Sequence, residues 1–225
     1  MPETAGETEL VRANGDRIST SPAYALYQAH PRALDSLVEQ TADWFFSEPA
    51  PISLEALVAM VRPSELSAAE YQAEGHGLAR PIAGSLIAVI CVDTAEGTRF
   101  PNADKLRSEL GMPDDGLWDR AHANLRDRAN ATPPKLEPGR LATITTGVGL
   151  AASLLSDDVF WRHPNLAAAG DLVVSAIELD QVIVARREED ELVRSMRRLA
   201  ADYRSPDFLS DQLLLRRGGE WTVFV

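Results

Sequence analysis

The segment SLIAVICVDTAEG, residues 85–97, contains a run in which every residue from Leu86 to Val92 is apolar and several are β-branched. Such a run is typical of a strand that is covered on both faces. It includes Cys91, the only cysteine of the chain, and Asp93 follows two residues later. In an extended chain both side chains point to the same face. The segment therefore predicts a central strand and raises the question of whether Cys91 has a chemical role.

Strand-like segments elsewhere in the chain occur in pairs around turn residues. Asn-Gly and Gly-Gly supply the positive φ angles that tight hairpins require. Four hairpins or strand pairs are predicted, around Asn14-Gly15, Pro138-Gly139, Leu179-Asp180 and Gly218-Gly219.

Apolar residues at spacings of three, four and seven predict amphipathic helices between these pairs. The first begins at Pro22 and has an inner face of Tyr24, Tyr27, Leu34, Leu37, Val38, Ala42 and Phe45. A short helix is predicted from an N-cap at Ser53 to Pro63. Further helices are expected over 102–110, 114–128, 150–160 and 188–203. Antiparallel hairpins with helices between them predict an α+β fold, a mainly antiparallel sheet backed by helices.

The chain reads as a loose tail over residues 1–7 followed by a single α+β domain over 8–225. Residues 64–80, SELSAAEYQAEGHGLAR, are small, polar and rich in glycine, which favours a connection. If the domain has two lobes, this connection separates a hairpin with helices (8–63) from the main sheet (81–225).

Composition limits the classes of function. A chain of 225 residues with 45% hydrophobic and 25% charged residues is an ordinary globular mixture. One cysteine excludes an intramolecular disulfide, and no segment approaches the roughly 18 apolar residues of a membrane span. We therefore expect a soluble cytoplasmic protein that does not bind membranes. The net charge of -12 argues against nucleic acid as a partner. It indicates either a surface that only keeps the protein soluble or one that attracts a basic partner.

Four residues on adjoining predicted elements are the candidates for a catalytic site: Cys91, Asp93, His122 and Asn124. In a hydrolase or transferase, Asp93 would orient or act as base, His122 would shuttle protons and Asn124 would hold a carbonyl or hydroxyl. Each has a structural alternative. A buried cysteine without a base behaves as a small hydrophobe. Asp93 can end its strand by binding turn amides, and His122 can pack beside Trp118.

The segment ITTGVGLAASLL, residues 144–155, matches a dinucleotide-binding pattern. Gly147, Gly149 and Ala152 fit G-x-G-x-x-G/A, and Glu178 ends a later strand where an acid could bind ribose hydroxyls. However, the following helix is expected to be short, and no second βαβ half follows it. Nucleotide binding at Gly147–Ala152 is therefore the third candidate function, and no cofactor is otherwise expected.

Metal binding is not predicted. The four histidines have no metal-ligand spacing: His30, His76, His122 and His163. Paired acids stand at predicted helix starts, where carboxylates cap free amides: Asp114-Asp115, Asp157-Asp158 and residues 188–191.

Several stretches together resemble the bacterial YtpQ-like family, a domain of unknown function. They lie within residues 80–205, and their landmarks are Asp93-Thr94, Ala121, Asn124-Leu125, Leu154-Leu155, Trp161 and Gly170-Asp171. The resemblance implies an intracellular α+β protein and carries no reaction, cofactor or catalytic residue.

Because the core patterns are well formed and no chemical groups converge, the leading hypothesis is a non-catalytic module that binds another protein through its helices and acidic surface. The hydrolase or transferase near Asp93 and His122 is the alternative. The sequence does not indicate the oligomeric state.

Overall fold

The computed structural model describes residues 51–94, 97–205 and 208–225, the backbone of two strands over 9–11 and 17–19, and three isolated helical positions. The predicted tail (1–7), the Asn14-Gly15 turn and most of the first predicted helix lie outside the described residues. The three helical positions are Val38, Glu39 and Ala42. Val38 was predicted on the inner face of that helix, but its side chain is 57% exposed.

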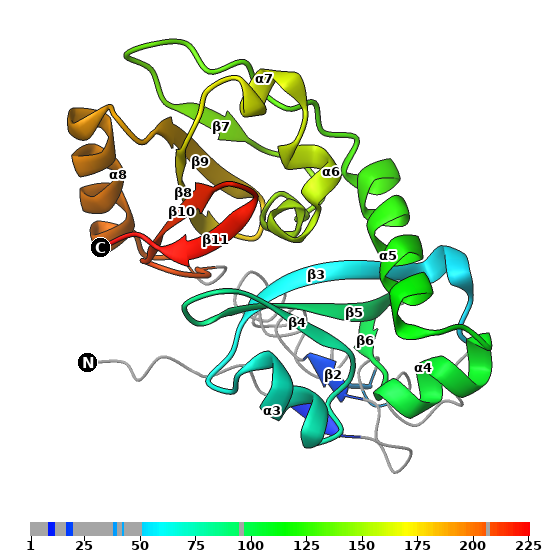
Figure 1. Ribbon diagram of the computed structural model, residues 1–225. Helices are drawn as coiled ribbons and strands as arrows, with labels where there is room; N and C mark the ends of the chain where they lie inside the picture. The colour runs from blue at the N-terminus through cyan, green and yellow to red at the C-terminus, as the bar shows by residue number, and fades with distance from the viewer. Residues whose placement is uncertain are drawn as a thin grey trace.

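Two antiparallel sheets form the molecule (Figure 1). In the first, the order β1-β2-β6-β5-β3 places β3 at one edge, and β4 also pairs with β5. Since β3 pairs along one edge of β5, β4 and β6 share the other, at opposite ends. The strands are β1 (Glu9–Val11), β2 (Arg17–Ser19), β3 (Leu57–Pro63), β4 (Ala79–Ala83), β5 (Leu86–Thr94) and β6 (Gly97–Phe100).

The second sheet has the order β11-β10-β8-β9-β7. Its strands are β7 (Ala142–Ile144), β8 (Leu172–Glu178), β9 (Gln181–Arg186), β10 (Leu213–Arg217) and β11 (Glu220–Val223). The predicted hairpins at Leu179-Asp180 and Gly218-Gly219 are both present. Gly218 and Gly219 have φ angles of 59° and 93°, which a two-residue hairpin turn needs and which most residues avoid. The α+β class with antiparallel sheets is confirmed.

The helices begin and end largely where local chemistry indicates. Asn102 caps α4 by accepting a hydrogen bond from the Lys105 amide at 2.8 Å, and Gly111 ends the helix in the left-handed region. The helical elements are η2 (Leu54–Ala56), α3 (Ala68–Ala73), α4 (Ala103–Leu110), α5 (Asp114–Ala129), η3 (Ala152–Ser156), α6 (Asp158–Trp161), α7 (Pro164–Ala167) and α8 (Asp190–Asp202).

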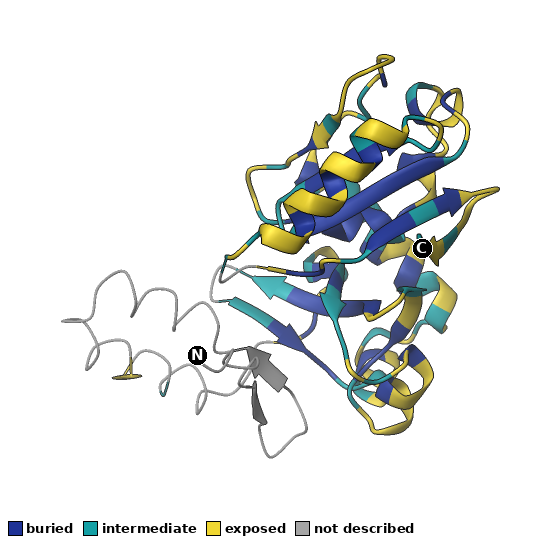
Figure 2. Ribbon diagram, turned by 90° about the vertical axis from the view of Figure 1, so that its left-hand side faces the viewer, coloured by how far each residue is buried: buried dark blue, intermediate teal, exposed yellow. Residues whose placement is uncertain are grey.

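Alternation along β8, β9 and β10 divides the apolar residues between two layers. Val173, Ile177 and Ile183 pack with α8, whereas Val174 and Val184 belong to the larger core shared with the first sheet. This is the period of two that a strand imposes on its side chains. Figure 2 shows α8 lying across the buried strands with its exposed residues turned outward. The second sheet is thus covered on both faces.

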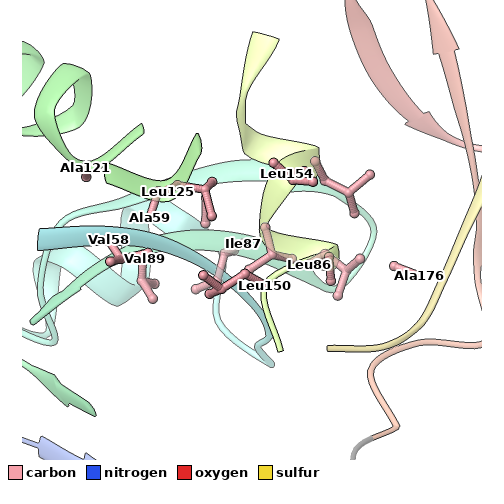
Figure 3. Close-up of a cluster of buried hydrophobic side chains, with 14 of the residues drawn as sticks. Val58, Ala59, Leu86, Ile87, Val89, Ala121, Leu125, Leu150, Leu154 and Ala176 are labelled. Atoms are coloured by element: carbon pink, nitrogen blue, oxygen red, sulfur yellow. The ribbon is translucent and has the colours of Figure 1, made fainter. Parts of the chain in front are cut away.

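The larger core is continuous between the two sheets. Figure 3 shows Leu125 of α5 and Leu150 and Leu154 at η3 gathered over β3 and β5. Leu86 to Val92 of β5 are all buried, so the apolar run that predicted a doubly covered strand is confirmed. The inner stripe predicted for residues 114–128 is also buried: Leu117, Trp118, Ala121 and Leu125.

In the described part of the chain, no further strand pairs with the outer edge of β3, and side chains bind its peptide groups instead. Asn124 of α5 donates from its side-chain amide to the carbonyls of Leu54 (2.6 Å) and Leu57 (2.8 Å). The buried Ser153 hydroxyl accepts a hydrogen bond from the Val61 amide at 3.2 Å. Pro63, on the same side of the strand, has no N–H to satisfy. These contacts satisfy peptide groups that would otherwise be costly to bury.

The predicted short helix from Ser53 to Pro63 is wrong. Only one 3-10 turn, η2, follows Ser53, and Leu57–Pro63 forms strand β3 in register with β5. Leu57, Val58 and Val61 are completely buried. A short apolar run is consistent with either a helix or a strand. Here hydrogen bonding to β5 makes it a strand. The grouping of residues 8–63 as a hairpin with helices is corrected accordingly.

Residues 64–80 are also more ordered than a connection, and they join β3 to β4 within the same sheet. Helix α3 begins with a capping box, in which Ser67 and Glu70 each bind the other's backbone amide. The pattern Ser-x-x-Glu was the signal for this helix. A seam between lobes at 64–80 is therefore wrong.

Two further predicted elements are shorter than expected. Of the strand pair around Pro138-Gly139, only β7 forms, and the three prolines before it remove amide donors that a strand would use. The helix predicted over 150–160 is divided at Asp157 into η3 and α6. The Asp157 carboxylate accepts a hydrogen bond from the Val159 amide and so starts the second helix.

The tip of the β4–β5 hairpin contacts the second half of the chain. Gly84 has a φ of 58°, and a Cβ there would lie 1.8 Å from the side-chain oxygen of Gln212. The Ser85 amide donates to the same oxygen at 3.4 Å. Glycine is therefore required at position 84 for both its backbone conformation and this close approach.

Among the described residues, no helix is both long and apolar enough to cross a membrane.

Replacing Ser153 with alanine tests the edge contact of β3. Ser153→Ala leaves the Val61 amide buried without an acceptor, so we expect the free energy of unfolding to fall by about 1–3 kcal/mol. The measurement is urea denaturation followed by circular dichroism. Ser195→Ala is the matched control, because the Ser195 hydroxyl is exposed on α8 and binds only the Glu191 carbonyl. Equal stability losses in the two variants would contradict the role of Ser153.

Candidate functional site

Cys91 lies in the middle of β5 and is completely buried. Its thiol donates to the Val58 carbonyl of β3 at 3.4 Å. Burial raises the pKa of the Cys91 thiol far above its ordinary value, and the nearby Asp93 carboxylate acts in the same direction. A thiol of this kind is a poor nucleophile, because the reactive form is the thiolate.

Asp93 lies at the end of β5 in an open depression that is also lined by Ser53, Glu55 and Arg128. Its carboxylate accepts hydrogen bonds from Thr98 (2.7 Å) and Arg128 (2.6 Å). Arg128 also donates to the Glu55 carbonyl at 2.8 Å and thereby joins β5 to η2. Both Asp93 oxygens are engaged in holding these elements together.

His122 and Asn124 both project from α5, but toward different neighbours. The His122 ring nitrogen Nε2 lies 3.2 Å from the Ser156 hydroxyl, and the ring packs against Trp118. Since the Ser156 hydroxyl donates to the Ser153 carbonyl, its oxygen accepts the proton of neutral His122. Burial lowers the pKa of His122 below its ordinary value. Asn124 instead donates from its side-chain amide to the carbonyls of Leu54 and Leu57, beside the edge of β3.

Asp93 and His122 have separate partners on different sides of α5. Arg128, which holds Asp93, is six residues after His122, roughly 9 Å along the helix axis at 1.5 Å per residue. Asn124 and Arg128, four residues apart, face the first sheet, while His122 faces η3. The catalytic grouping of Asp93, His122, Asn124 and Cys91 thus corresponds to four separate structural contacts.

The glycine-rich loop surrounds an internal carboxylate. Asp180, in the β8–β9 turn, accepts hydrogen bonds from the Thr146 amide (3.0 Å), the Gly147 amide (2.7 Å) and the Thr146 hydroxyl. Burial opposes its charged form, but these bonds prevail and keep the pKa of Asp180 below its ordinary value.

The surroundings of this loop differ from a dinucleotide-binding fold. The loop leads into the 3-10 helix η3, in which the Ala152 amide already binds the Leu179 carbonyl. The neighbouring strands β7 and β9 are antiparallel. Dinucleotide binding at Gly147, Gly149 and Ala152 requires free loop amides, an α-helix and parallel strands. Here the Gly147 amide binds Asp180, a 3-10 helix follows the loop, and the neighbouring strands are antiparallel.

The paired acids serve local structure. Asp114, in the first turn of α5, binds Arg107 through both oxygens at 2.7 and 2.9 Å, and this contact lowers the pKa of the carboxyl. Asp157 binds Arg126 at 2.7 Å, and Glu189 accepts from the Gly139 amide at 2.6 Å. Within the described ranges, no group of three or more histidine, cysteine or acidic residues could hold a metal ion.

The outer face of α8 was not among the sites predicted from the sequence. Four arginines are exposed on α8 and just beyond its end, and we call them the α8 arginine surface: Arg194, Arg197, Arg198 and Arg204. None forms an ion pair with a carboxylate in the described part of the chain. Other arginines do so: Arg80, Arg107, Arg126, Arg128, Arg140, Arg162, Arg187, Arg216 and Arg217.

Part of the α8 arginine surface is held in place by neutral groups. Arg194 donates to the Asp190 carbonyl at 3.2 Å, and Arg204 donates to the Ala201 carbonyl at 2.8 Å. The Arg197 guanidinium lies 5.8 Å from the ring centre of Phe224. These contacts orient the arginines without neutralising them. The signal available in the sequence was the repetition of arginines, Arg194, Arg197 and Arg198, within an amphipathic helix.

Comparisons with known proteins do not add a function. No family model, no curated protein and no solved structure matches this chain. The resemblance to the YtpQ-like family therefore stays a prediction.

The buried thiol predicts slow chemical modification. We expect Cys91 in the folded protein to react with Ellman's reagent or iodoacetamide only as fast as the protein unfolds, because both the thiolate and access are lacking. The same thiol should react rapidly in concentrated guanidinium chloride, which serves as the control. Rapid labelling of the folded chain would show that Cys91 is accessible and activated.

The depressed pKa of His122 predicts loss of stability in acid. Above its ordinary pKa of 6.5, His122 is neutral in both the folded and unfolded states. As the pH falls below 6.5, the unfolded state binds the proton first, so the free energy of unfolding decreases until the folded pKa is passed. Urea denaturation at several pH values should therefore show a smaller acid-induced loss for His122→Gln than for the wild type. Parallel pH profiles of the two proteins would contradict this assignment.

Proposed function

We propose that this protein is a binding module that recognises an acidic segment of another protein through the α8 arginine surface. The observation that carries the proposal is the position of the unpaired cations. In a chain with a net charge of -12, three exposed arginines of α8 and Arg204 just beyond it have no carboxylate partner among the described residues. Arginine is well suited to such recognition because its planar guanidinium can bind a carboxylate through two parallel hydrogen bonds.

The arrangement carries a small cost in the free protein. Arg194 and Arg198 are four residues apart on α8, and like charges at this spacing destabilise a helix by a few tenths of a kcal/mol. A carboxylate on a partner would remove this repulsion. Leu199, which is 42% exposed, follows Arg198 and offers an apolar contact beside the charges. Both features support a protein-binding role for this face.

Charge distribution favours a short acidic segment over a long polyanion. The start of α8 and the residues before it carry the acids Glu188, Glu189, Asp190 and Glu191. A nucleic acid or an anionic membrane that contacts the arginines would also approach these acids, and charges within about 8 Å are poorly screened at physiological salt. A short acidic peptide can contact the arginines alone. The net charge by itself suggested a basic partner. The binding experiment below therefore also tests a basic peptide.

Binding of a fluorescein-labelled oligoglutamate peptide to the full chain tests the proposal. Fluorescence anisotropy should show binding that weakens with added salt. Replacing two cations with neutral residues of similar shape, Arg194→Gln with Arg198→Gln, should weaken it about tenfold, equivalent to roughly 1.4 kcal/mol. The matched control is Arg120→Gln with Arg140→Gln, because these arginines are also exposed and the change in net charge is equal.

Three results would overturn the proposal. One is preferential binding of an oligolysine peptide, which would identify the acidic surface as the binding face. Another is tighter binding of single-stranded DNA than of oligoglutamate. The third is an equal loss of affinity in both double variants, since that would show a general effect of charge without a role for α8.

A further inference from the structure

A separate cavity lies between the end of α5, η3 and the two short helices that follow. Its volume is about 190 Å³. A cavity of roughly 150 Å³ with apolar walls is large enough for benzene. The polar groups that line the cavity are Arg126 and His163, and its apolar walls come from Ala131, Pro133, Leu154, Val159 and Phe160.

The Arg126 side chain is anchored at one end. One of its terminal nitrogens donates to the Asp157 carboxylate at 2.7 Å, and Asp157 is only 2% exposed. Asp157 is itself held by the Val159 amide. Arg126 makes no other hydrogen bond within the described ranges, so its remaining N–H groups are available to a molecule in the cavity.

His163 provides a second donor. Its ring nitrogen Nδ1 accepts a hydrogen bond from the Asn165 amide at 3.3 Å. In the neutral ring the proton therefore lies on Nε2, which makes that atom a donor. The two polar residues of the cavity thus offer N–H groups, and a complementary ligand has to supply acceptor oxygens.

The inner wall of the cavity, formed by Leu154 and Phe160, is fixed before any ligand binds. The Trp161 indole donates to the Leu154 carbonyl at 2.7 Å, and Phe160 packs edge to face against Trp161. Leu154 and Phe160 are both at least 95% buried, so neither is free to move aside. Val159 and His163 are exposed, so the cavity is open to solvent on their side. A preformed apolar site avoids part of the entropy cost of ordering side chains on binding.

We propose that this cavity binds a small organic carboxylate with a compact apolar body, of about the size of benzoate. The carboxylate would accept hydrogen bonds from Arg126 and His163, and the body would lie against Phe160 and Leu154. Asp157 already neutralises part of the Arg126 charge, so we expect a modest affinity, with a Kd of roughly 0.1–1 mM. This site is independent of the α8 arginine surface.

Benzoate is the probe, and the full chain is titrated with it by isothermal calorimetry and by ¹H–¹⁵N NMR. Benzyl alcohol, which lacks the carboxylate, and acetate, which lacks the apolar body, should each bind at least tenfold more weakly. The Trp161 indole resonance should shift on addition of benzoate. Wild-type protein and Arg198→Gln should bind benzoate equally, which separates this site from the proposed function.

Variants locate the site. Ala131→Leu fills the cavity and should abolish benzoate binding. Val159→Phe narrows the same cavity from a position that is already exposed, so it remains informative if Ala131→Leu does not fold. Arg162→Gln is the matched control, since Arg162 is 74% exposed and pairs with Asp158 outside the cavity.

Absence of benzoate binding by the wild type at millimolar concentration would overturn the inference. So would binding that Val159→Phe leaves unchanged, or equal binding of benzoate and benzyl alcohol. If Arg162→Gln lowers the affinity for benzoate as much as Val159→Phe does, benzoate binds outside the cavity.

Discussion

The structure depends on burying the edge of β3 in the middle of the protein. An edge strand normally leaves a row of peptide groups to solvent or to another strand. Here four of the seven residues of β3 are buried and the other three are half-buried, so the polar groups of that edge need partners from elsewhere. Asn124 binds the Leu57 carbonyl and Ser153 binds the Val61 amide. These two contacts require α5 and η3 to lie beside the strand in one particular register.

Because α5 and η3 are placed by β3, they connect the two halves of the molecule. Asn124 and Arg128 of α5 bind the first sheet and η2, while His122 and Arg126 bind the segment of η3 and α6. Two indoles also bind η3: Trp161 of α6 donates to the Leu154 carbonyl, and Trp221 of β11 in the second sheet donates to the Leu155 carbonyl. Helix α5 and the η3–α6 segment therefore connect β3 to the second sheet, and the cavity beside Arg126 is lined by residues of both.

Local patterns in the sequence were sufficient to predict those strands and helices that depend mainly on residues close to one another in the chain. The run Leu86–Val92, the hairpins of the second sheet and helices α4, α5 and α8 follow from periodicity, turn residues and caps. The strand Leu57–Pro63 did not, because its pattern suits a helix as well and its pairing partner is distant in the chain. The role of Asn124 could not be predicted either, since its acceptors lie 67 and 70 residues away. A polar residue that appears catalytic in sequence can be consumed by a long-range structural contact.

Helices α5 and α8 show why the sequence pattern alone does not separate structural from binding residues. Both begin with acids and carry several arginines, although only α5 has arginines in its last turn, where they complement the helix dipole. In α5, Arg126 and Arg128 meet Asp157 and Asp93 from other elements and are neutralised there. In α8, the arginines face outward, and no element in the described part of the chain brings a carboxylate to them. The difference lies in tertiary neighbours: α5 passes between two layers that both supply acids, whereas α8 covers the outside of a sheet. A cation that folding leaves unpaired in a strongly acidic chain keeps its capacity to bind an anion from another molecule. In the described part of the chain, α8 carries three such arginines, and Arg204 follows just beyond it.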